Sequence, residues 1–257
     1  MSIGQLVVNM SPSENGLAIS LLRILSPHID LQASGSWTES ATYLQGKIMS
    51  SHVSELLGDF GLDVHNFISS NGQVSFNLNW RAAPYAPNLA SLTGRATLSL
   101  GPGRIVDISQ TSGAKMDLGR MLSIFSLQTI PRRLSLDFSD IFQKGYSFDS
   151  VRGDFTFRNG SAYTDNLRFD GPVARVDING RIGLKDKDYN FILGVRPYVT
   201  ASLPVAATLI TLNPLVGLGA LAVNTVVGSQ VSKVTAYRYQ VTGSWNNPSW
   251  KSISGSR

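Results

Sequence analysis

Apolar and polar residues alternate along most of the chain, a pattern typical of a β-strand with one buried face. The alternation is clearest at 73–80 (QVSFNLNW) and at 173–180 (VARVDING). Strands of this kind are predicted at 4–10, 16–25, 28–37, 43–49, 73–80, 92–100, 104–109, 134–138, 153–158, 161–169, 173–180, 188–196 and 234–243. Many short strands joined by short turns predict an antiparallel meander.

Turn and helix signals complete this picture. Asn159-Gly160 favours the positive φ angles of a two-residue hairpin turn between two of these strands. A short helix is expected over 51–60, capped by Ser51, and a second over 118–128, after Asp117. The predicted fold class is therefore mainly β (α+β), with two or three short helices.

The alternation leaves the role of the apolar strand faces open. If two sheets stack, these faces form the core of a β-sandwich, which is the arrangement that periodicity alone favours. If one long sheet curls without a second layer, the same faces form an open apolar trough that suits acyl chains. Such a surface would need a ligand or a partner to be tolerated.

A long uncharged stretch interrupts the strand pattern near the C-terminus. Residues 197–232 contain no charged residue, whereas the overall charged fraction of 15% predicts about five. Asn213-Pro214 divides the stretch into two apolar pieces, each short for crossing about 30 Å of hydrocarbon. We therefore expect a helical hairpin that contacts a membrane or caps an apolar core. The chain is accordingly divided into a β region (1–196), the hairpin (197–232), and a final strand with a polar tail (233–257).

Composition argues against most kinds of chemistry. The chain has no cysteine, and its three histidines fit no metal-ligand spacing. No catalytic, phosphate-binding or cofactor motif is present, so we expect a non-enzymatic protein without cofactors. The net charge is +5, and the only adjacent basic pair is Arg132-Arg133, so no nucleic-acid partner is expected.

Four segments together resemble one family. They are SLQTIPRRLSLDFSDIFQKGYSFDSVRGDF (126–155), FDGPVARVDINGRIGLKDKDY (169–189), LPVAATL (203–209) and YQVTGSWNNPSW (239–250). They resemble the C-terminal part of the YhdP family, within the AsmA-like envelope proteins of Gram-negative bacteria. The resemblance covers roughly 45–250 and implies a long antiparallel sheet curled into a groove with an apolar interior. It also implies a function in moving phospholipid between the inner and outer membranes, with this part at the distal end.

The resemblance gives the apolar positions an expected role. Strand residues that would contact acyl chains in the groove are Phe155, Phe157, Leu167, Phe169, Ala174, Val176, Ile178, Phe191 and Leu193. Hairpin residues that would contact a membrane are Leu203, Val205, Leu209, Leu212, Leu215, Val216, Leu218, Leu221 and Val226.

The expected setting is the cell envelope, with the chain periplasmic and associated with the outer or inner membrane surface. The first 25 residues lack the basic and apolar regions of a signal peptide. We therefore expect a fragment or split product that acts with an anchored upstream part of the same system. The alternatives are an envelope scaffold that assembles outer-membrane β-proteins through its sheet edges, and a plain β-sandwich domain with a buried hairpin.

Overall fold

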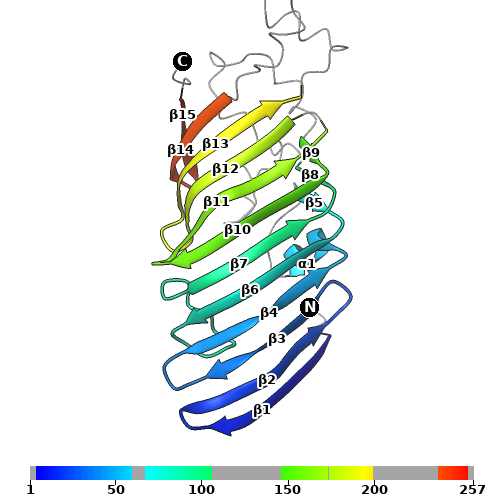
Figure 1. The fold of residues 1–257 in the computed structure, drawn as a ribbon, viewed down its shortest axis with the longest axis vertical. Coiled ribbons are helices and arrows are strands. Elements are labelled where there is room, and N and C mark those ends of the chain that lie inside the picture. The colour runs from blue at the N-terminus through cyan, green and yellow to red at the C-terminus, as the bar shows by residue number, and fades with distance from the viewer. Residues whose placement is uncertain (1–3, 60–66, 106–145, 173, 199–236, 254–257) are drawn as a thin grey trace, which may run out of the picture.

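The computed structural model describes residues 4–59, 67–105, 146–172, 174–198 and 237–253 of the 257-residue chain. Most of these residues belong to one twelve-stranded sheet (Figure 1). Its strands are β1 (Gln5–Ser13), β2 (Gly16–Leu25), β3 (Asp30–Trp37), β4 (Thr42–Ser50), β6 (Gly72–Trp80), β7 (Thr93–Leu100), β10 (Ser150–Arg158), β11 (Ser161–Asp170), β12 (Ala174–Gly183), β13 (Asp188–Pro197), β14 (Tyr237–Ser244) and β15 (Asn247–Ser252).

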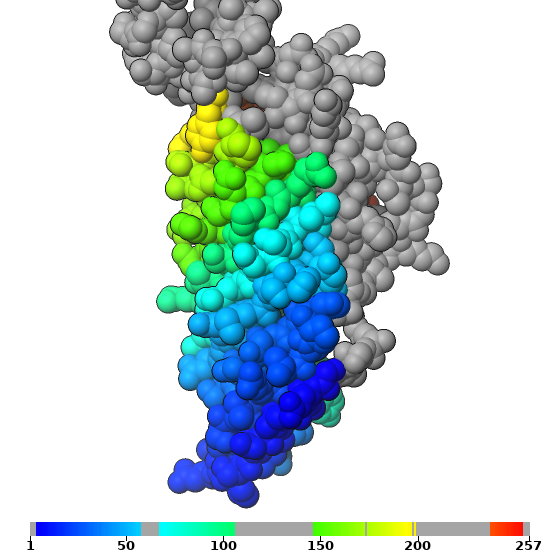
Figure 2. Space-filling view, turned by 90° about the vertical axis from the view of Figure 1, so that its right-hand side faces the viewer, coloured from blue at the N-terminus to red at the C-terminus, as the bar shows by residue number. Residues whose placement is uncertain are grey.

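The large sheet is a meander in which strand order follows chain order. Every pair of neighbouring strands is antiparallel, and β1 and β15 are the two edges. The strands succeed one another along the long axis of the molecule, as both views show (Figures 1 and 2). At about 4.8 Å per strand, twelve strands extend over about 50 Å. The predicted antiparallel meander is confirmed.

A small second sheet is formed by segments that leave the meander. Its strands are β5 (Phe67–Ser69), β8 (Gly103–Ile105) and β9 (Tyr146–Phe148), paired in that order. This sheet is far smaller than the twelve-stranded one. Within the described ranges no second large sheet faces the meander, so the sandwich that periodicity alone favours is not found there.

The described residues contain one short helix, α1 (Val53–Asp59), in the connection between β4 and β5. A helix is thus present within the predicted range 51–60, but it begins at Val53. The predicted cap Ser51 does not cap it, because the Ser51 hydroxyl lies 3.0 Å from Nδ1 of His52 instead. No helix in the described part of the chain is long and apolar enough to cross a membrane. The helix predicted over 118–128, the strand over 134–138 and nearly all of the hairpin predicted over 197–232 lie outside the described residues.

The C-terminal prediction needs one correction. Residues after 244 were expected to form a turn and a polar tail, but 247–252 add a twelfth strand, β15, to the sheet. The segment NPSWKS has one large apolar residue, Trp250, which pairs with Val241 of β14. A single apolar position cannot produce a recognisable alternation, so pairing with β14 decides the structure of this segment.

The turn between β10 and β11 has the predicted conformation. Asn159 and Gly160 have φ angles of 51° and 71°, so both residues lie in the left-handed region. A β-carbon added at Gly160 would also lie 2.8 Å from Cβ of Lys185.

We expect Gly160→Val to lower the free energy of unfolding by about 1–3 kcal/mol, because valine strongly disfavours a positive φ. The measurement is urea unfolding followed by circular dichroism. Thr156→Val, at an exposed strand position, is the control and should change stability by less than about 0.5 kcal/mol. Equal stability of the two variants would contradict the left-handed turn.

Candidate functional site

One face of the large sheet is apolar from its first strand to its last. Residues that are cross-strand partners share a face, and alternate residues of a strand point the same way. One line of partners crosses eleven strands, and we call it the central row: Leu6, Ile24, Leu31, Ile48, Val74, Leu98, Gly153, Leu167, Ile178, Leu193 and Tyr239. From β1 to β13 this row contains only aliphatic side chains and one glycine.

Gly153 is the position where the central row passes a β-bulge. The register between β10 and β11 shifts between Arg152 and Thr156, so Gly153 is not directly paired with Leu167. A β-carbon at Gly153 would nevertheless lie 2.9 Å from Cα of Leu167, which places the two residues in contact. The glycine keeps the row continuous where any side chain would displace the neighbouring strand.

Two further lines of cross-strand partners flank the central row on the same face. One is formed by Val8, Leu22, Ala33, Gly46, Phe76, Ala96 and Phe155, and the other includes Met10, Ile19, Gly35, Leu44, Leu78, Gly94, Phe157, Ala162, Ile182 and Tyr189. Together with the central row they define the apolar face, which is at least three residues wide.

The opposite face of the sheet is polar. In β3 to β7 it carries mostly amide and hydroxyl side chains, for example Gln32, Gln45 and Asn77. In β10 to β14 it carries ion pairs, such as Arg168–Asp177 at 2.9 Å and Arg175–Asp170 at 2.8 Å. The two faces of the sheet therefore differ in polarity along its whole length.

Exposure of the apolar face changes along the sheet. At the N-terminal edge its side chains are open to solvent, with Leu6 57% and Met10 48% exposed. Phe76 and Leu78, near the middle, are half-buried. At the C-terminal end the face is buried, and Val241 of β14 has no exposed surface.

The small sheet packs against part of this buried end. Phe148 of β9 lies between two rings, stacked on Phe67 at 5.8 Å and edge-on to Phe169 at 6.0 Å. The hydroxyl of Tyr146 donates a hydrogen bond to the carbonyl of Ala174, at 3.0 Å. Burial, helped by the nearby Tyr198 and Asp170, raises the pKa of Tyr146, so its hydroxyl stays neutral.

All nine strand residues predicted to contact acyl chains lie on the apolar face. Four of them extend it beyond the three lines, because they alternate with central-row residues of the same strands: Phe169, Ala174, Val176 and Phe191. Phe155 and Phe157 are half-buried. The other seven are at most 7% exposed and belong to a single packed cluster: Leu167, Phe169, Ala174, Val176, Ile178, Phe191 and Leu193. The nine hairpin residues predicted to contact a membrane, from Leu203 to Val226, lie outside the described residues.

Sequence reasoning missed the N-terminal half of the apolar face. Leu22, Ile24, Leu31 and Leu44 continue the same face, although only the C-terminal strands were assigned to it. The alternation in 43–49 is the signal that could have found Leu44, whereas 16–25 is apolar at nearly every position and shows no clear alternation.

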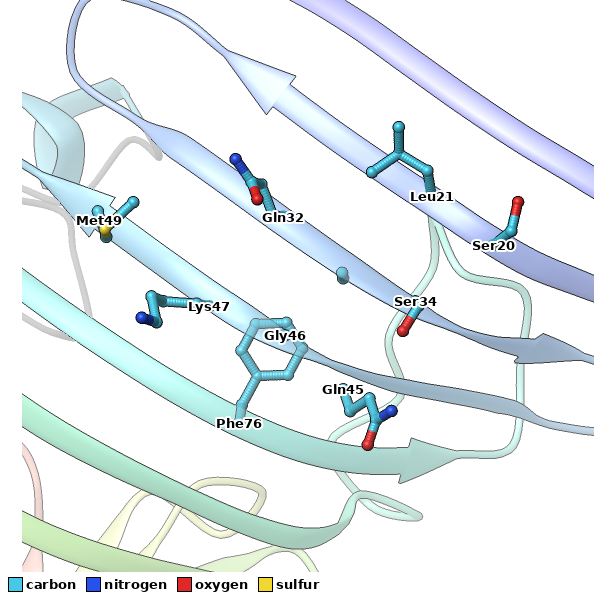
Figure 3. A pocket seen from close by; sticks show the side chains of 10 residues that line it. Ser20, Leu21, Gln32, Ser34, Gln45, Gly46, Lys47, Met49 and Phe76 are labelled. Carbon is cyan, nitrogen blue, oxygen red and sulfur yellow. The ribbon is translucent and has the colours of Figure 1, made fainter.

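A shallow depression of about 620 Å³ lies over β2, β3 and β4 (Figure 3). Gln32, Ser34, Gln45 and Lys47 of its lining come from the polar side of the sheet. Lys47 is the only ionisable residue of the lining, so the depression has no acid–base pair. Among the described residues no group of acidic or histidine side chains could hold a metal ion.

Comparison with known proteins identifies the family. The model of the family described as YhdP protein matches residues 1–250. The chain belongs to the YhdP family. It is 32% identical over 222 residues to the intermembrane phospholipid transporter YhdP of Escherichia coli strain K12, an alignment that covers 85% of this chain. The chain spans about a sixth of that relative, since the same alignment covers 17% of it.

Family membership agrees with the resemblance in the sequence and with a non-enzymatic function at family level, because the relative is named as a transporter. No solved structure matches the chain.

Proposed function

We propose that the chain forms one segment of a β-groove that conducts phospholipid between the inner and outer membranes of a Gram-negative envelope. Acyl chains lie against the apolar face. The transfer involves no chemical reaction and therefore needs no cofactor. The central row carries this proposal, because from β1 to β7 each strand of the large sheet offers hydrocarbon an aliphatic side chain that is at least partly exposed. Family membership and the transporter name of the relative support it.

The energetic role of the apolar face is to replace water around the acyl chains. Each methylene group that leaves water for an apolar surface gains about 0.8 kcal/mol. A phospholipid that crosses an aqueous space pays this cost along both of its chains, whereas one that slides along the rows does not. The barrier to lateral transfer is therefore low. The transfer needs no covalent intermediate.

The proposed location of the chain in the cell follows from this role in phospholipid transfer. The chain lies in the periplasmic part of the envelope, as the distal segment of a longer path with an anchored upstream part. Its partners are phospholipid and a membrane surface, and the uncharged residues 197–232 contact that membrane. The central row from Leu6 to Leu98, where every side chain is half-buried or exposed, receives the lipid.

Photo-crosslinking in cells tests the lipid path. We expect a photoreactive residue at Phe157, on the apolar face, to form adducts with phospholipid. The matched control is Thr156, the preceding residue of β10, which is exposed on the polar face and should form none. Equal adducts at both positions, or adducts with proteins alone at Phe157, would contradict the proposal.

A second candidate function is an envelope scaffold that pairs with outer-membrane β-proteins through a sheet edge. Strand β1, which lies at one edge of the described sheet, is the observation that favours it: its nine residues include no charged one, and Leu6, Val8 and Met10 are exposed. Uncharged edges readily accept another strand. A photoreactive residue at Val7 separates the two functions: a scaffold gives adducts with several outer-membrane proteins, whereas a lipid path does not require them.

A further inference from the structure

Five consecutive strands each place one arginine on the polar face near the same end of the sheet. We call this set the arginine patch: Arg152 of β10, Arg168 of β11, Arg175 of β12, Arg196 of β13 and Arg238 of β14. Figure 1 shows these strands side by side at the C-terminal end of the sheet. The rest of the polar face, from β1 to β7, has only Arg23, Asp30, Lys47 and Arg95 as charged residues.

Two pairs of these arginines face each other directly across neighbouring strands. Arg152 is the cross-strand partner of Arg168, and Arg175 is the partner of Arg196. Like charges in directly opposed positions destabilise a sheet. Nearby carboxylates offset part of this repulsion at Arg168, Arg175 and Arg196, but Arg152 forms no ion pair within the described residues, so an excess of positive charge remains.

The carboxylates at this end of the sheet do not neutralise the patch. Asp170 pairs with Arg175, and Asp177 pairs with Arg168 and, at 3.6 Å, with Arg196. Asp149, in the turn before β10, is the third carboxylate, so five guanidinium groups face three carboxylates. In the described part of the chain Arg152 and Arg238 form no ion pair, and both are exposed.

The neighbourhood of the patch has the character of a membrane interface. Arg196 directly precedes the uncharged residues 197–232, and Lys233 directly follows them. Tyr198, which comes just after β13, is 41% exposed. Tyrosines at the water interface and basic residues that flank an uncharged segment are both typical of chains that contact a bilayer.

From this placement we infer that the arginine patch docks the end of the sheet on an anionic phospholipid bilayer by binding phosphate head groups. Guanidinium groups suit this ligand because their planar donors bind phosphate oxygens in pairs. The inference rests on the proposed function and deepens it, since it names the class of membrane that the C-terminal end of the path contacts. Phosphates between Arg175 and Arg196 would also relieve the repulsion between these two side chains.

Flotation of the full chain with vesicles tests this inference. Vesicles of phosphatidylcholine alone are compared with vesicles of equal parts phosphatidylcholine and phosphatidylglycerol. We expect the chain to prefer the anionic vesicles and to lose this preference as salt is raised, because salt screens the attraction. Equal binding of the unsubstituted chain to both vesicle types at low salt would overturn the inference.

The decisive variant replaces Arg196→Gln and Arg238→Gln together. Each basic residue near an anionic surface strengthens binding about fivefold, so this variant should lose about 25-fold in affinity for anionic vesicles. The control, Lys47→Gln with Arg95→Gln, removes the same charge from β4 and β7, far from the patch. An equal loss in both variants would mean that net charge alone matters, and would overturn the inference.

Two readouts separate this inference from its rivals. Thermal unfolding of the Arg196→Gln, Arg238→Gln variant should change little, because loss of the 3.6 Å contact between Arg196 and Asp177 is offset by loss of the repulsion between Arg196 and Arg175. A marked downward shift would indicate a structural role and would overturn the inference. The crosslinking of phospholipid at Phe157 should remain in this variant. Loss of vesicle preference with crosslinking retained supports docking, whereas failure of the lipid path itself would abolish the Phe157 adducts in the unsubstituted chain.

Discussion

Replacing Phe76→Glu should remove at least about nine tenths of the phospholipid that copurifies with the chain. Phe76 lies on the apolar face between Gly46 and Ala96, whose small side chains leave its ring as the main apolar contact there. A carboxylate at this position would have to lose its water for every acyl chain that passes. That cost amounts to several kcal/mol, and 1.4 kcal/mol already corresponds to a factor of ten in affinity.

The matched control for this experiment is Asn77→Glu, one residue further along β6. Asn77 points to the polar face, where its amide donates a hydrogen bond to the hydroxyl of Tyr43 at 3.0 Å. This variant introduces the same charge into the same strand, so the copurified phospholipid should stay near the level of the unsubstituted chain. Mass spectrometry of extracted lipid per mole of protein gives the measurement. Equal lipid in the two variants would refute the assignment of the apolar face as the lipid path.

The second large effect concerns the C-terminal half of the face. We expect Phe191→Ala to lower the free energy of unfolding by about 3–5 kcal/mol, the usual cost of removing a buried aromatic ring. Phe191 is 3% exposed, and its ring meets that of Tyr189 edge-on at 5.7 Å. The burial of Tyr189 also raises the pKa of its hydroxyl.

The control for Phe191 is its neighbour, Ile192→Ala. Ile192 lies on the polar face, opposite Asn179 and Gln240, and is half-buried. Its truncation should cost less than about 1.5 kcal/mol in urea unfolding. If Phe191→Ala costs no more than Ile192→Ala in delipidated protein, the C-terminal half is an open lipid surface rather than a packed core.

The comparison of Phe191→Ala with Ile192→Ala matters because the sequence predicts which side chains share a face, but not which residues pack over that face. Alternation correctly places Val176, Ile178 and Phe191 together, because the period of two is a local property of the chain. Their burial depends on contacts with Phe67, Phe148 and other distant residues, which no local pattern encodes. The predicted lipid contact at these positions therefore remains a prediction.

Local signals also explain which parts of the fold were predictable. The left-handed turn at Asn159-Gly160 follows from two residues whose side chains tolerate a positive φ. Strand β15 was not predicted, because its place depends on pairing with β14 rather than on its own composition. Alternation also cannot distinguish one long sheet from two stacked sheets, because both architectures place the same alternate residues on one face.

The composition of the central row has a kinetic consequence for the proposed transfer. Because aliphatic side chains repeat on every strand from Leu6 to Leu98 and remain at least partly exposed, each of these positions offers a sliding chain a similar contact energy. Such a surface has no deep minimum in which a lipid would halt, and it cannot discriminate among head groups. Selectivity and directionality then belong to the two ends of the path, and throughput depends on how fast lipids are loaded and unloaded there.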